Sequence, residues 1–127
     1  MRFMMLMIPN IADEAADWVP SPEAVAAMSK YNEELAEAGA LLSLDGLHPT
    51  ASGARVSFRG GKPFVTDGPF AEAKEAVGGY WLIDVGSRQE AIEWASRCPA
   101  DDGQIIEVRQ VFEISEFPAE VRAAAGL

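Results

Sequence analysis

The stretch Arg2-Phe-Met-Met-Leu-Met-Ile8, RFMMLMI, decides the fold, because six successive side chains after Arg2 are apolar. A strand with one face in water alternates apolar and polar residues, whereas an uninterrupted apolar strand is covered on both faces. The stretch Gly79 to Val85, GYWLIDV, has nearly the same character. We therefore predict that these two segments are the central pair of a sheet covered on both faces.

Two amphipathic segments supply helices for one of those faces. The first is expected to start after the N-cap residue Ser21, with Pro22 in its first position, and to end at Gly39. The second is expected to start at a capping box formed by Ser87 and Glu90. Both helices carry apolar side chains at three- and four-residue spacing, which is typical of a helix packed on one side.

The remaining strands complete an α+β fold. Residues 40–47 and 104–112 are expected to be strands, and residues 55–59 and 62–66 form a β-hairpin around Gly60-Gly61. Without that inserted hairpin the order is strand, helix, strand, strand, helix, strand, which predicts a ferredoxin-like antiparallel sheet with two helices on one face. We expect one domain over residues 1–115 and a C-terminal tail over residues 116–127.

The sheet face without helices also needs a cover. One chain of 127 residues offers no third layer for it. We therefore expect a second copy to cover it, which gives a homodimer with two sheets face to face, a dimeric α+β barrel.

Composition excludes several classes of function. Twenty acidic against ten basic residues give a net charge of -10, so we expect no nucleic-acid partner. The first apolar run is far shorter than the roughly 18 residues that span a bilayer. With a single cysteine, Cys98, we expect a cytoplasmic protein without disulfides, metal or cofactor and without membrane contact.

Four segments together resemble a known family: RFMMLMIP, NEELAEAGALLSLDGLHP, VTDGPFAEAKEAVGGYWLIDV and IIEVRQV. They are similar to the YCII-related family, in particular to its branch named for the DGPF motif, here Asp67 to Phe70. The resemblance implies a dimeric α+β barrel in a bacterial protein. It also implies that most relatives have no known function, that many are encoded beside extracytoplasmic-function sigma factors, and that one related member is a dehalogenase.

The resemblance implies one catalytic residue and the residues themselves suggest another. The family's suspected His–Asp pair maps its Asp onto Asp67, whereas the first helix carries Tyr31 in the region where relatives carry the His. Asp67 is either a general base at a strand end or an Asx-turn residue. His48, the single histidine, is either a proton shuttle or an ordinary loop residue.

Four further residues are expected to bind substrate, each beside a structural alternative. Arg109 either clamps a carboxylate or pairs with Glu107 on the same strand face. Lys74 either binds an anion or forms an exposed ion pair with its neighbour Glu75. Tyr80 and Tyr31 either line a pocket or pack in the core.

These residues predict a protein that binds or transforms a small polar or aromatic molecule in a cleft at the dimer interior. Cofactor-free proton transfer, as in isomerisation or elimination, is the chemistry that they could support. Whether the protein is an enzyme stays open. The alternative is a non-catalytic accessory protein that works with a sigma factor or another regulator, with an acidic surface that docks on a basic partner.

Overall fold

The structure is a computed structural model that describes residues 1–10, 17–70 and 76–126, and it confirms the α+β fold class. The elements follow in the expected order, with short 3₁₀ helices (η) and a C-terminal helix added. In chain order they are β1 (Arg2–Ile8), α1 (Pro22–Glu37), β2 (Leu41–Gly46), η2 (Thr50–Ser52), β3 (Ala54–Arg59), β4 (Lys62–Asp67), β5 (Gly79–Asp84), α2 (Arg88–Ser96), β6 (Ile105–Gln110), η4 (Ile114–Glu116) and α3 (Ala119–Ala124).

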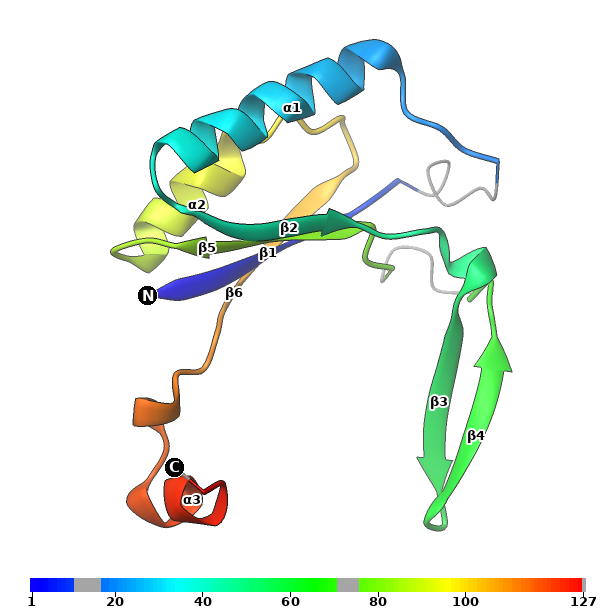
Figure 1. The fold of residues 1–127 in the computed structure, drawn as a ribbon. Helices are drawn as coiled ribbons and strands as arrows, with labels where there is room; N and C mark the ends of the chain where they lie inside the picture. The colour runs from blue at the N-terminus through cyan, green and yellow to red at the C-terminus, as the bar shows by residue number, and fades with distance from the viewer. Residues whose placement is uncertain (11–16, 71–75, 127) are drawn as a thin grey trace.

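Four strands form one antiparallel sheet in the order β2-β5-β1-β6, so β1 and β5 are the central pair, as predicted. Met5 lies opposite Trp81 and Leu6 lies opposite Tyr80 across that pair. Helices α1 and α2 cover one face (Figure 1). The hairpin β3–β4 is a separate two-stranded sheet, and it extends to the side of the main sheet away from those helices.

Both predicted helix starts are confirmed. The Ser21 hydroxyl accepts the Ala24 N–H at 3.1 Å, and Gly39 follows the helix with φ 73°. The Ser87 hydroxyl accepts the Glu90 N–H at 3.1 Å, but the Glu90 carboxylate accepts the N–H of Gly86 rather than that of Ser87. In the second capping box, the Glu90 carboxylate therefore bonds to the residue before the N-cap instead of to the N-cap residue itself.

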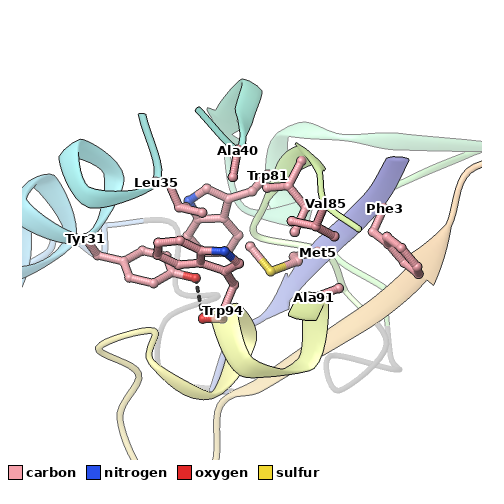
Figure 2. Close-up of a cluster of buried hydrophobic side chains, with 10 residues drawn as sticks. Phe3, Met5, Tyr31, Leu35, Ala40, Trp81, Val85, Ala91 and Trp94 are labelled. Carbon is pink, nitrogen blue, oxygen red and sulfur yellow. Dashed lines mark hydrogen bonds between the residues drawn. The ribbon is translucent and has the colours of Figure 1, made fainter. Parts of the chain in front are cut away.

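The core lies between the helices and the central strands (Figure 2). Tyr31 is buried and its hydroxyl donates to the Trp94 carbonyl at 2.6 Å. Its ring meets those of Trp81 and Trp94 edge-on, at centroid distances of 5.9 and 6.3 Å. Burial raises the pKa of Tyr31, so this hydroxyl keeps its proton and its hydrogen bond at any ordinary pH.

The helix-free face of the sheet is largely apolar at its centre. The register places Met4, Leu6 and Leu82 on it, all partly exposed in the single chain. The hairpin β3–β4 and the segment that leads to α3 both extend on this side of the sheet (Figure 1). The helix-free face therefore lies between two projecting parts of the chain.

Candidate functional site

A cleft of about 1100 Å³ lies between the N-terminal half of α1 and one end of the sheet. At this end β1 and β2 finish and β5 begins, and the loop after α2 closes a further side. The cleft is on the helix-covered side, because α1 and helix-facing strand residues such as Met7 and Trp81 line it. Its position results from the length of α1, whose first turns reach beyond the packed core.

The walls of the cleft are mainly apolar. Met7, Met28, Leu44, Trp18 and Trp81 contribute side chains from β1, α1, β2, the segment before α1, and β5. The Trp81 indole is held in place, because its N–H donates to the Asn32 side-chain oxygen at 2.8 Å. A pocket with such walls takes up the apolar or aromatic body of a ligand.

A small number of polar groups are set into these walls. Asn32 faces in from α1, where its side-chain oxygen meets Trp81. Asp45 on β2 and Tyr80 on β5 also line the cleft, but the register places both side chains on the helix-free face of the sheet, since Tyr80 lies opposite Leu6 and Asp45 lies opposite Tyr80. The Tyr80 hydroxyl donates to an Asp45 carboxylate oxygen at 3.0 Å. His48 lies just after β2 with its side chain exposed, so it remains accessible to solvent and to a ligand.

The charge of the cleft has one sign. Glu23, Asp45 and Asp101 line it, and none of its described lining residues is a lysine or an arginine. A carboxylate or phosphate ligand would find no cation there. The cleft therefore favours a neutral or positively charged compound.

Asp67 lies elsewhere, at the end of β4 where the hairpin rejoins the body. Its side chain is exposed, it does not line the cleft, and it accepts no hydrogen bond from any residue that the structure describes. An Asx-turn to the second residue onward cannot form, because Pro69 at that position has no N–H. The prediction that Asp67 forms an Asx-turn with the residue two positions on is therefore wrong.

The other members of the DGPF stretch fix the base of the hairpin. The Gly68 N–H donates to the Gly53 carbonyl at 2.9 Å, and a Cβ at Gly68 would collide with the Thr50 carbonyl oxygen. The Phe70 ring lies beneath the Arg55 guanidinium, 4.0 Å from its carbon to the ring centroid. Gly68 and Phe70 thus have architectural roles, whatever Asp67 does.

The remaining candidates lie in three different places. Arg109 pairs with Glu107 at 3.3 Å on the helix-free face, with its side chain 71% exposed. Tyr31 is in the core and does not line the cleft. Lys74 is outside the described residues, as is its neighbour Glu75.

Of the five candidates that the structure describes, His48 and Tyr80 line the cleft, with the Tyr80 side chain on the helix-free face. Sequence reasoning missed Asn32 and Trp18 and gave Asp45 no role. Asn32 follows the core residue Tyr31 on α1, and a side chain next to the buried stripe of a helix is a signal that could have found it.

A second, smaller hollow of about 640 Å³ lies between α2 and β6 and includes Cys98. Burial raises the pKa of the Cys98 thiol to about 11, so at neutral pH it is a protonated, weak nucleophile. Within residues 1–10, 17–70 and 76–126, no group of three His, Cys, Asp or Glu side chains is placed to hold a metal ion. Over the same residues, no helix has both the length and the hydropathy to cross a bilayer.

Comparison with known proteins gives a family and one relative. The model of the YCII-related domain matches residues 1–115. "Uncharacterized protein R00369" of Rhizobium meliloti (strain 1021) is 40% identical over 68 residues, which cover 54% of this chain and 55% of that relative. The match thus spans about half the length of the relative.

Proposed function

Because the chain belongs to the YCII-related domain family, we propose that it is a small-molecule-binding protein of the DGPF branch that works as a homodimer. The observation that carries the proposal is the cleft of about 1100 Å³ beside α1, with apolar walls and convergent polar groups. The sequence motif DGPF at Asp67 to Phe70 supports the branch. The apolar centre of the helix-free face supports the dimer.

The ligand class follows from the lining. The walls suit an aromatic or aliphatic body, and the Asn32 side chain suits a hydrogen-bonding end. Glu23 and Asp101, with no lysine or arginine among the described lining residues, favour an amine or a neutral polar group over an acid. The proposed ligand is a neutral or cationic compound with an apolar body. This is a narrower ligand class than the small polar or aromatic molecule expected from the sequence.

Proton transfer is the chemistry that this cleft supports if the bound molecule is transformed. His48 is the one histidine among the described residues that line the cleft, and imidazole is the side chain most often used for proton transfer in proteins. An imidazole at the mouth could accept a proton from a ligand held by Asn32 and the apolar walls. In an isomerisation the imidazolium would return that proton to a second atom of the ligand, and in an elimination the ligand would lose a leaving group with its bonding electrons. The Asp67 base expected from the sequence would act from outside this cleft.

The first experiment is ligand-observed NMR with a panel of neutral, cationic and anionic aromatic compounds. Neutral and cationic members are expected to bind, and anionic members are not. The variant Asp101→Asn removes a charge from the cleft lining at nearly constant size, so it should weaken cationic compounds at least tenfold and leave neutral ones unchanged. Asp84→Asn, an exposed carboxylate at the other end of β5, is the matched control.

Two results would overturn this proposal. One is that no member of the panel binds at millimolar concentration. The other is that binding persists when Ala27→Trp fills the cleft. If a bound compound is converted, His48→Gln should abolish conversion while binding remains.

The accessory role is the second candidate, and the net charge of -10 favours it. A surface of that sign docks on a basic protein through contacts that weaken with salt. Titration of this protein into a purified extracytoplasmic-function sigma factor would test the role. A complex that dissociates as ionic strength rises would favour it, whereas the absence of a complex at low salt would exclude that partner.

A further inference from the structure

The hairpin β3–β4 sorts its side chains into two unlike faces. Val56 lies opposite Val65 and Phe58 lies opposite Pro63, so these four share one face. The other face carries the three cations of the hairpin, which are Arg55, Arg59 and Lys62, together with Ser57, Phe64 and Thr66. The hairpin is therefore amphipathic, with an apolar face and a basic face.

No residue that the structure describes covers the apolar face of the hairpin. Phe58 is 73% exposed, Val65 is 69% exposed and Val56 is 53% exposed. Every residue of both strands is exposed. A two-stranded hairpin is at best marginally stable in water unless its apolar face packs on something, so this face calls for a partner.

The charge of the hairpin is opposite to that of the rest of the chain. Residues 54–67 contain three basic residues and one acidic residue, Asp67, whereas the whole chain has 10 basic and 20 acidic residues. On the basic face the Arg59 guanidinium lies 4.6 Å from the centre of the Phe64 ring, so that ring is already partnered. The basic hairpin of one copy is therefore electrostatically complementary to the acidic remainder of a second copy.

The position of the hairpin points to the same partner. It extends from one end of the sheet toward the helix-free side (Figure 1). The partly exposed side chains of Met4, Leu6 and Leu82 lie on that face of the sheet. The base of the hairpin is fixed by the Gly68–Gly53 hydrogen bond and by the Arg55–Phe70 contact. A second copy placed on the helix-free face would lie beside this hairpin.

We infer that the β3–β4 hairpin is a docking arm for a second copy of this chain, and that Val56, Phe58 and Val65 pack on the partner's helix-free side. The inference rests on the homodimer of the proposed function and goes beyond it. It assigns a role to the inserted hairpin and, through Gly68 and Phe70, to the DGPF motif that fixes it. The acidic body of the partner attracts the basic hairpin, and its apolar face makes the contact.

The experiment places a photo-reactive benzoylphenylalanine at position 58 or at position 64 of the full chain. Position 64 is on the opposite face of the same hairpin and serves as the matched control. Irradiation is expected to give a covalent dimer from position 58 and little from position 64. Sedimentation equilibrium should show that Phe58→Ser raises the dissociation constant of the dimer at least tenfold, whereas Phe64→Ser leaves it within about twofold.

The other outcomes separate this inference from the dimer itself. A dimer that gives no cross-link from position 58 and tolerates Phe58→Ser would overturn the docking arm and leave the dimer standing. A monomer at all concentrations would overturn both. A circular dichroism spectrum and a melting temperature for each variant confirm that the compared chains are equally folded.

Discussion

The four-stranded sheet and the hairpin are both antiparallel, and both carry apolar side chains on at least one face, yet they differ completely in burial. In the sheet, Ile83 is 0% exposed beneath the helices, whereas in the hairpin Phe58 is 73% exposed. Their sequence patterns differ, because β1 is apolar at six successive positions whereas β3 alternates Val56 and Phe58 with polar residues. Such a pattern reports which side chains share a face, but it does not report which element covers that face.

The two regions also owe their stability to different contacts. The sheet is held by a core that includes Phe3, Met5 and Leu35, each nearly or fully buried. The hairpin is held by its turn at Gly60-Gly61, with φ values of 57° and 77°, and by the DGPF contacts at its base. Loss of one buried side chain should therefore matter most in the sheet, and loss of backbone fit should matter most at the hairpin.

The largest expected effect is in the core. Ile83→Ala should lower the free energy of unfolding by about 2–5 kcal/mol, because it removes a fully buried side chain and leaves a cavity. Urea unfolding followed by tryptophan fluorescence measures this loss. Val25→Ala on the exposed side of α1 is the control, with an expected change below about 0.5 kcal/mol. Equal losses for both variants would contradict the assignment of Ile83 to the core.

The next effect is at the hairpin base. Gly68→Ala should cost about 1–3 kcal/mol or displace the hairpin, because its new Cβ meets the Thr50 carbonyl. The comparison is Gly46→Ala, where a Cβ meets nothing within 4 Å. Amide chemical shifts of residues 54–67 report the displacement. Unchanged shifts together with unchanged stability in Gly68→Ala would show that the close approach to η2 is not required.

A smaller effect is expected one residue earlier. Asp67→Ala should change the free energy of unfolding by less than about 0.5 kcal/mol, since the exposed carboxylate has no hydrogen-bond donor among the described residues. Thermal unfolding of both proteins, with the mass checked by light scattering, makes the comparison. A loss of about 1 kcal/mol or more would instead indicate a structural role for Asp67, and a loss of ligand binding at unchanged stability would indicate a functional one.

The smallest effect concerns pH. A hydrogen bond from Arg2 lowers the pKa of Glu113 below its ordinary value of 4.5, and the Arg2 charge adds to this. A carboxyl whose folded pKa is lowered contributes stability above its unfolded pKa and loses it as the pH falls through the folded value. The urea midpoint of the wild type should therefore fall more between pH 6 and pH 3 than that of Glu113→Gln. Parallel profiles would show that this exposed pair contributes nothing measurable.

The fold could be predicted closely from the sequence because its signals are local. The hydropathy of RFMMLMI predicts a strand, and the capping residues Ser21 and Pro22 predict a helix start. The structure confirms both predictions. The site could be predicted only in part. His48 and Tyr80 line the same cleft, but Asp67 and Arg109 lie apart from it. Which of these residues come together depends on how the strands pair in the sheet, and a local sequence pattern does not specify that pairing.

The sequence by itself determined the order of helices and strands, the central pair of the sheet, the hairpin turn and the acidic charge, because each depends on neighbouring residues or on composition. Tertiary structure alone decided that Asn32 and Trp81 share a cleft and that Gly68 rests against the backbone of η2. It also decided that the apolar face of the hairpin is exposed among the residues that the structure describes. These features depend on which surfaces come into contact when the chain folds. Periodicity specifies the faces of each element, and packing between distant elements selects their partners.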